Sequence, residues 1–253
     1  MPSPSKPRLC VFGDSHYAAV KRAVDEQLVD TSGVDLEFWG HAGNRFRFLE
    51  WKDDCIRPID DFTAKRFAKF NEKQRRFLDP RDFDAIVFVG SRLRTTRVFA
   101  LLLDARLSDD KFLSQQLEHE IVRHHLEGEL TYHFARNIAA LNVRVLFSPV
   151  SFDIKSTPND AADVYAKALA AKETDRRGVW KIVAHEMGQD GIELIPQRAV
   201  TVTDGCFTKA KYATDRYVER NDYTHKNAAY GALVFQDVLK VLKVDQDQIS
   251  KSA

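Results

Sequence analysis

Hydrophobic residues in this chain fall into short continuous runs separated by longer stretches with helical spacing. Three of the runs are almost wholly apolar, at Leu9–Phe12, Ala85–Val89 and Val143–Phe147. Strands have this composition when both of their faces are covered, as they are in a parallel sheet. Together with two weaker runs, these segments predict five buried strands, at residues 8–13, 34–39, 84–90, 142–148 and 191–195.

Helical stripes lie between the predicted strands. Residues 16–29 and 226–243 each carry small and aliphatic side chains at steps of three and four, the spacing of an amphipathic helix. Strands that alternate with helices predict an α/β fold, in which a parallel sheet is covered by helices on both sides. We expect one domain over residues 1–253, with a polar tail at 245–253.

Two connections are longer than a minimal crossover. Residues 41–83 are rich in Arg, Lys, Asp and Phe, and residues 91–141 contain a long helical pattern. One interpretation is that these insertions supply extra helices that pack on the sheet. The other is that they form a partial lid over a functional site, because long insertions in compact domains often carry function. The sequence leaves both open.

Charge and composition narrow the possible classes of function. Lys and Arg number 38 against 37 Asp and Glu, so the sequence predicts no general attraction to nucleic acid or to an acidic membrane. No apolar run approaches the roughly 20 residues that span a bilayer. The first strand leaves no room for a signal peptide, and Cys10, Cys55 and Cys206 show no disulfide framework. We therefore expect a cytoplasmic protein with reduced thiols.

Four histidines gather in the second insertion, at His119, His124, His125 and His133. His119 and His124 are five residues apart, whereas two imidazoles share a helix face at a spacing of four. We interpret these histidines as ordinary polar positions of a long helix. The sequence predicts no metal site and no other cofactor.

Candidate chemistry lies in two short motifs near the two ends of the chain. Gly13-Asp14-Ser15-His16 follows the first predicted strand, and Asp222-Tyr223-Thr224-His225 precedes the last predicted helix. Ligands of open parallel sheets bind beyond the carboxyl ends of the strands, where Ser15 is expected to lie. A serine, an imidazole and a carboxylate are the groups that acyl transfer through a serine requires. Asp14 is expected to hold its turn through hydrogen bonds to the backbone.

These motifs resemble the first and last sequence blocks of the SGNH/GDSL hydrolases. The extended segments are similar to members associated with bacterial carbohydrate O-acylation and deacylation. The resemblance implies a flavodoxin-like three-layer α/β/α sandwich with a central five-stranded parallel sheet, and acyl-ester hydrolysis or transfer without a metal. It also implies that Ser15 is the nucleophile, His225 the base and Asp222 the acid that orients the base.

The same resemblance implies an oxyanion hole formed partly by the amide of Ser15. Gly43 matches the glycine of the second block best, with Gly40 as the runner-up. The third block normally supplies an asparagine, but the matching position holds Arg92. Three replacements are open: Arg92 donates instead, Asn44 reaches in, or only backbone donors remain. Loss of one such donor typically costs about 10²–10³ in rate.

Basic side chains are concentrated where the resemblance places the substrate mouth. They are Arg45, Arg47, Arg92, Arg94, Arg97 and Lys226. One interpretation is a solvated rim, since surfaces are charged in any case. The other is a site for an anionic acyl substrate held by arginine side chains. The expected substrate contacts are Asn44, Arg45, Arg94 and Lys226.

Three functions are compatible with these observations. The first is a serine-dependent hydrolase of acyl esters, most simply acetyl esters, on a carbohydrate or small molecule. The second is a carbohydrate O-acyltransferase that uses the same serine. The third is a catalytically weak SGNH-like protein that binds glycans, for which the missing asparagine is the best support. The acyl group, the acceptor and the oligomeric state are not specified by the sequence.

Overall fold

The computed structural model of the protein describes residues 6–41, 43–71, 73–155 and 165–249. Five strands form one parallel sheet in the order β2-β1-β5-β6-β7, which is the flavodoxin-like order 2-1-3-4-5 when only these strands are counted. The strands are β1 (Arg8–Gly13), β2 (Asp35–Gly40), β5 (Ala85–Arg94), β6 (Arg144–Val150) and β7 (Ile192–Leu194). The predicted α/β class and the five-stranded parallel sheet are confirmed.

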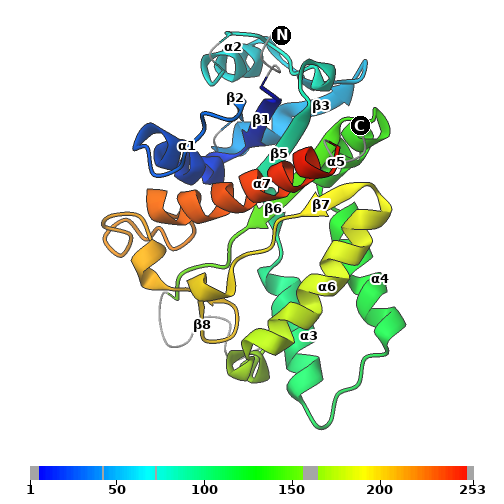
Figure 1. Cartoon of the computed structure of the whole chain (residues 1–253). Coiled ribbons are helices and arrows are strands. Elements are labelled where there is room, and N and C mark those ends of the chain that lie inside the picture. The colour runs from blue at the N-terminus through cyan, green and yellow to red at the C-terminus, as the bar shows by residue number, and fades with distance from the viewer. Residues whose placement is uncertain (1–5, 42, 72, 156–164, 250–253) are drawn as a thin grey trace.

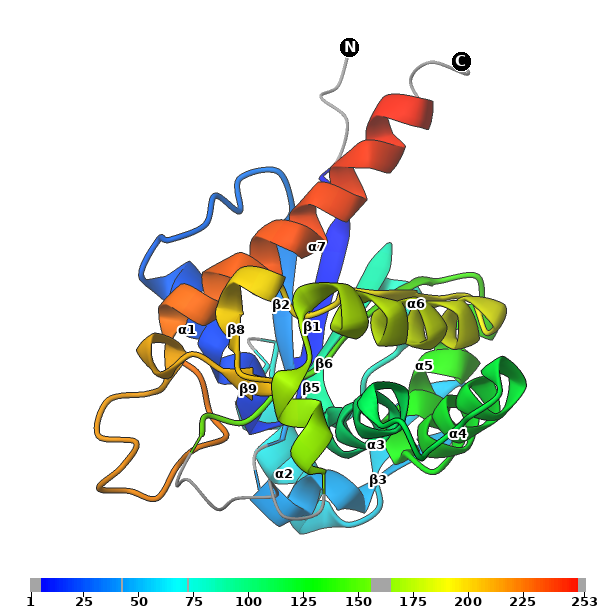
Figure 2. The ribbon, with the colours of Figure 1, turned by 90° about the horizontal axis from the view of Figure 1, so that it is seen from below.

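Helices cover both faces of this sheet, so the molecule has three layers (Figures 1 and 2). Alternate residues of β1 point into two different cores, because successive strand side chains face opposite ways. Leu9 and Val11 belong to the core beneath two helices, α1 (Ala18–Asp25) and α7 (Ala228–Ile249). Phe12 belongs to the core beneath the other helices, which are α2 (Asp61–Lys69), α3 (Thr96–Leu107), α4 (Gln115–Glu127), α5 (Leu130–Ala140) and α6 (Glu173–Gln189).

Helices α1 and α7 approach each other through small residues. Ala23, Ala228 and Ala232 form a buried cluster between them. A Cβ atom on Gly231 would overlap the backbone carbonyl of Ala19, so no larger residue fits at that position without moving a helix. This contact sets the distance between the segment that follows β1 and the segment that precedes α7.

The first insertion, residues 41–83, is only partly helical. It contains a hairpin of β3 (Leu49–Lys52) and β4 (Cys55–Pro58), followed by α2. The expectation of extra helices is therefore incomplete for this segment, because a strand pair of four residues each gives too short a pattern to recognise. Phe67 of α2 packs on Trp39 of β2, with ring centroids 5.4 Å apart, and fixes the insertion to the sheet.

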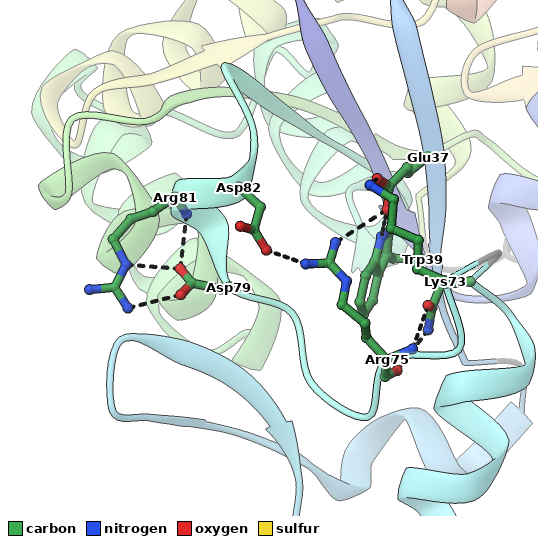
Figure 3. A network of polar contacts seen from close by, with 8 residues as sticks. Glu37, Trp39, Lys73, Arg75, Asp79, Arg81 and Asp82 are labelled. Atoms are coloured by element: carbon green, nitrogen blue, oxygen red, sulfur yellow. Dashed lines mark hydrogen bonds and ion pairs between the residues drawn. The ribbon is translucent and has the colours of Figure 1, made fainter.

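A network of charged side chains anchors the end of this insertion to the edge strand β2 (Figure 3). Glu37 is buried and accepts hydrogen bonds from Lys73, from Arg75 Nη2 at 3.3 Å and from Trp39 Nε1 at 3.2 Å. The guanidinium of Arg75 lies over the Trp39 ring and also pairs with Asp82. Burial favours the protonated carboxyl, but the hydrogen bonds from Lys73 and Trp39 outweigh it and lower the pKa of Glu37.

The second insertion, residues 91–141, forms α3, α4 and α5 rather than one long helix. The helical pattern breaks at Gly128, where α4 ends and the chain turns into α5. Phe99, Val122 and Phe134 from these three helices are buried in the core on the sheet. This burial agrees with helices packed on the sheet rather than with a lid.

Two further details complete the fold. A small antiparallel pair, β8 (Val202–Thr203) and β9 (Phe207–Thr208), follows β7. Helix α7 continues to Ile249, so the first part of the segment expected as a polar tail, 245–253, is helical. Within the described part of the chain, no helix has the length and apolar character needed to cross a membrane.

Replacing Glu37 by Gln should lower the free energy of unfolding at pH 7 by about 1–3 kcal/mol, because Lys73 and Arg75 lose their anion. The pKa of Glu37 is lowered by folding, so its stabilisation is present above the ordinary value of 4.5 and is lost as the pH falls through the lowered value. Urea unfolding should therefore show the wild type and Glu37→Gln converging in strongly acidic buffer. Glu50→Gln, on the partly exposed strand β3, serves as the control and should differ little from the wild type at any pH. A difference in the free energy of unfolding between the wild type and Glu37→Gln that persists in acid would contradict this account.

Gly231→Ala should destabilise the protein by about 1–3 kcal/mol, because the new methyl group forces α1 and α7 apart. The matched control is Gly188→Ala, at an exposed position of α6 where an added Cβ has open space. The control should gain up to about 1 kcal/mol from helix propensity. Thermal unfolding checks both, and equal Tm changes in the two variants would rule out the close contact.

Candidate active site

Three side chains from the two ends of the chain meet beyond the carboxyl end of β1. His225 Nε2 lies 2.8 Å from Ser15 Oγ, and His225 Nδ1 lies 2.8 Å from Asp222 Oδ1. Ser15 and His225 are 210 positions apart in the sequence. All three side chains are partly buried, and they form one hydrogen-bonded chain in the order serine, imidazole, carboxylate. This arrangement can move a proton from the serine hydroxyl to the imidazole.

The turn that carries Ser15 is fixed by its neighbours. Ser15 begins a short 3-10 helix, and Asp14 caps that helix by accepting a hydrogen bond from the His16 amide at 3.1 Å. Asp14 thus holds the turn as expected, and burial raises its pKa. Gly13 is needed here because a Cβ would overlap the carbonyl of Val89 on the adjacent strand.

The loop that carries Asp222 and His225 is organised by the same carboxylate. Asp222 Oδ1 accepts the backbone amide of His225 at 3.1 Å as well as its ring nitrogen, and Thr224 and Thr214 donate to the two carboxylate oxygens at 3.3 and 3.4 Å. Burial favours protonation, but the hydrogen bonds from His225 outweigh it and lower the pKa of Asp222. The carboxylate is therefore ionised at neutral pH and fixes the orientation of the imidazole.

His16 also belongs to the site, through a contact with His225 that could not be recognised in the sequence. Its ring stacks on that of His225, with centroids 4.9 Å apart and planes inclined by 25°. Burial, followed by the repulsion of a charged His225, lowers the pKa of His16 to about 3. His16 is therefore uncharged at neutral pH and gives His225 a flat, neutral support. Its place beside Ser15 in the motif was the only available signal.

The backbone of β5 is distorted where it reaches the site. Gly90, Ser91 and Arg92 have φ angles of 68°, 47° and 63°, and the pairing with β6 shifts register there. The two residues with side chains each cost roughly 1–2 kcal/mol in this left-handed region. Ser91 is held by hydrogen bonds from its Oγ to Phe12 O at 3.2 Å and from Thr131 Oγ1 to its own carbonyl at 2.6 Å. Such strain is typical of functional sites.

Two residues expected in the oxyanion hole contact each other. Arg92 Nη2 donates to the carbonyl of Gly43 at 2.7 Å, which joins the two insertions beside the site. Arg92 Nε is buried and has no hydrogen-bond partner within the described residues. The runner-up, Gly40, is packed against the backbone of Gly13, where no side chain would fit. Its role is to let β1 and β2 approach.

The expected substrate contacts lie in different surroundings. Asn44 is exposed, Arg45 pairs with Asp60 at 3.2 Å, and Arg94 is exposed with a long contact of 3.9 Å to Asp153. The fourth expected contact, Lys226, was predicted to lie at the substrate mouth, but it is not at the surface.

Lys226 is instead buried, at 3% exposure, and its Nζ donates to the carbonyl of Thr224 at 2.6 Å. Burial lowers the pKa of Lys226 to about 8. Its own carbonyl accepts from Arg22 Nη2 at 2.6 Å, so the residue links the histidine loop to α1. The sequence analysis named Lys226 as a substrate contact, but tertiary contacts turn its side chain inward.

An open pocket of about 620 Å³ lies beside Ser15, on the side of α1 and α7. Its charged lining has both signs, with Arg22 and Arg220 against Glu26 and Asp215, and Ser15, Asp222 and His225 also line it. Neither Arg45 nor Arg94 belongs to this lining. The pocket therefore lacks the uniformly basic character that the arginines of the sequence suggested.

No family model matches the chain, and no curated protein matches it significantly. Two solved structures are similar to it. One is a Salmonella ser. Paratyphi A lipopolysaccharide acetyltransferase periplasmic domain, at 13% identity and a TM-score of 0.42, with 94% of this chain and 84% of that chain covered. The other is a carbohydrate esterase family 2 enzyme with a carbohydrate binding domain from Corynascus thermopiles (Myceliophthora fergusii), at 14% identity and a TM-score of 0.38, with 96% and 68% covered.

The lowered pKa of His16 predicts an unusual titration. Among the eight histidines, His16 should keep the NMR shifts of a neutral imidazole down to about pH 4. Between the ordinary value of 6.5 and about 3, the unfolded chain binds a proton at this residue and the folded chain does not, so stability falls as the pH falls. His16→Phe should therefore lose less stability than the wild type between pH 7 and pH 4. A His16 resonance that titrates near pH 6.5 would refute the prediction.

Proposed function

We propose that this protein is a serine-dependent enzyme that cleaves acyl esters of a carbohydrate or small molecule, with Ser15 as the nucleophile. The observation that carries the proposal is the unbroken hydrogen-bonded chain Ser15–His225–Asp222, with 2.8 Å at each link. A serine hydroxyl is a weak nucleophile at neutral pH, so an oriented base beside it is the decisive requirement. The proposed substrate class follows from the resemblance of the two motifs to enzymes of carbohydrate acylation and deacylation.

In the proposed reaction, Ser15 Oγ attacks the ester carbonyl carbon while His225 Nε2 takes the hydroxyl proton. The ionised Asp222 stabilises the imidazolium that forms. The imidazolium then gives this proton to the departing alcohol, and the acyl group remains on Ser15. Water attacks the acyl group next, His225 accepts its proton and returns it to Ser15 Oγ, and the free acid leaves. No metal or cofactor takes part in these steps.

The negative charge that develops on the carbonyl oxygen requires hydrogen-bond donors. The proposed donors are the amides of Ser15 and Gly43. The Ser15 amide lies at the first position of its helix, where an amide has no partner within the helix itself. We add Arg92, whose buried Nε lacks an acceptor in the described structure. A guanidinium in this role would replace the asparagine of the family pattern.

His16 supports the same chemistry by its charge state. A second protonated histidine stacked on His225 would oppose the formation of the imidazolium. Because the pKa of His16 is lowered to about 3, its ring is neutral when the base accepts a proton. Its stacking also restricts rotation of the base, which keeps Nε2 directed at Ser15.

Acyl transfer to a sugar hydroxyl is the second candidate function. The pocket of about 620 Å³ beside Ser15 supports it, because such a volume can hold a polar acceptor next to the acyl group. Its lining, which carries charges of both signs, suits a hydroxylated molecule more than a strongly anionic one. Cytoplasmic location remains part of the proposal.

Ser15→Ala and His225→Ala should each lower the hydrolysis of p-nitrophenyl acetate by roughly 10⁴-fold, because each removes a member of one catalytic unit. The double variant should be no slower than either single variant. Asp222→Asn should also be impaired, since it removes the charge that stabilises the imidazolium. Circular dichroism checks that each variant is folded.

Matched controls are Ser32→Ala and His124→Ala, both at exposed positions outside the site. They should retain wild-type activity.

Adding a sugar acceptor separates the two candidate functions, because a transferase forms acylated sugar at the expense of free acid. Equal background rates in the wild type and Ser15→Ala, with acetylated sugars as well as with the test ester, would contradict the hydrolase and leave a selective transferase or a glycan-binding protein.

A further inference from the structure

A second cluster of chemically active side chains lies between α4 and α6, apart from the residues around Ser15. It consists of His119 from α4 and of His185 and Glu186 from α6. The potential ligand atoms of these three residues all lie within 4.8 Å of one another. His119 Nδ1 is 2.6 Å from Glu186 Oε1, and the two imidazole rings are perpendicular, with centroids 5.1 Å apart.

The packing of the two helices produces this convergence. Helices α4 and α6 run side by side on the face of the sheet that is opposite to α1 and α7 (Figures 1 and 2). Glu186 is buried and faces α4, where it meets His119 and, one helical turn later, Arg123. His185 is its exposed neighbour on α6. The cluster therefore has a buried carboxylate at its base and one imidazole open to solvent.

Arg123 orients the groups around the cluster. Its Nη2 donates to Glu186 Oε2 at 2.7 Å and to Gln189 Oε1 at 2.6 Å. With its oxygen held there, Gln189 directs its amide nitrogen at His185 Nε2, 2.8 Å away. Zinc binding through that ring nitrogen displaces this contact, because the nitrogen has only one lone pair to offer.

We propose that His119, His185 and Glu186 bind a Zn²⁺ ion. Two imidazoles and one carboxylate form a donor set that suits zinc, and the fourth tetrahedral position is left for water. Binding requires His119 to move its proton from Nδ1 to Nε2, a change of tautomer without loss of charge. It also requires the 2.6 Å separation of Nδ1 and Oε1 to open to about 3.3 Å, the spacing of ligands around tetrahedral zinc.

The neighbouring charge sets the strength of binding. Arg123 already neutralises part of the Glu186 carboxylate, so a dissociation constant in the micromolar range is expected rather than the tighter binding of closed structural sites. The ion would fasten α4 to α6. None of the three ligands belongs to the Ser15 cluster or to its pocket, so the proposal is independent of the proposed ester chemistry.

The test is calorimetric titration of ZnCl₂ into the whole protein at pH 7, after removal of metals with EDTA. The wild type should bind one ion per chain. His185→Ala should weaken binding at least tenfold, and because His185 is exposed, this variant should fold normally. His119→Ala should weaken it similarly. Zinc should also raise the Tm of the wild type by several degrees and leave the Tm of His185→Ala unchanged.

His124→Ala is the matched control, since His124 is an exposed histidine of the same helix outside the cluster. It should bind zinc as the wild type does. Failure of the wild type to bind at submillimolar zinc would overturn the proposal. Unchanged affinity in His185→Ala would do so too, as would an equal loss in His124→Ala, because both indicate adventitious binding to surface histidines. Ester hydrolysis does not enter any of these measurements.

Discussion

The close packing of α1 on α7 is the constraint on which the candidate site depends. Ser15 lies three positions before the start of α1 at Ala18, and His225 lies three positions before the start of α7 at Ala228. The separation of the two helices therefore determines the separation of the two side chains. Gly231 allows the helix backbones to touch at Ala19. The hydrogen bond from Arg22 of α1 to the carbonyl of Lys226 then fixes the loop in register. A contact built from the smallest side chains thus brings a hydroxyl and an imidazole to hydrogen-bond distance.

Both insertions converge on the same region by different means. The first is secured to β2 by Phe67 and by the ion network of Glu37, and the second by helices buried on the sheet. Their loops meet where Arg92 donates to Gly43. The left-handed residues of β5 have a cost, and the hydrogen bonds of Ser91 and Arg92 offset it. The site therefore stands at a junction of three segments, each held by its own core contacts.

Much of the fold could be predicted because parallel strands are covered on both faces and their apolar runs are continuous. The Ser15 and His225 motifs were recognisable because each is local in sequence. The β3–β4 hairpin was missed because its strands are short and mixed in polarity. The stacking of His16, the burial of Lys226 and the meeting of His119 with His185 depend on contacts between distant segments. No periodicity or spacing carries that information.

The wide separation of Ser15 and His225 in the sequence also has a consequence for biosynthesis. The ribosome makes Ser15 at a point 210 positions before His225, and α7 must still emerge and dock before the two side chains meet. All five strands of the sheet precede α7 in the chain, so a nascent chain contains the whole sheet before Ser15 and His225 can meet. The hydrogen bond between Ser15 and His225 therefore forms only after α7 has docked, so its presence reports that this helix is in place.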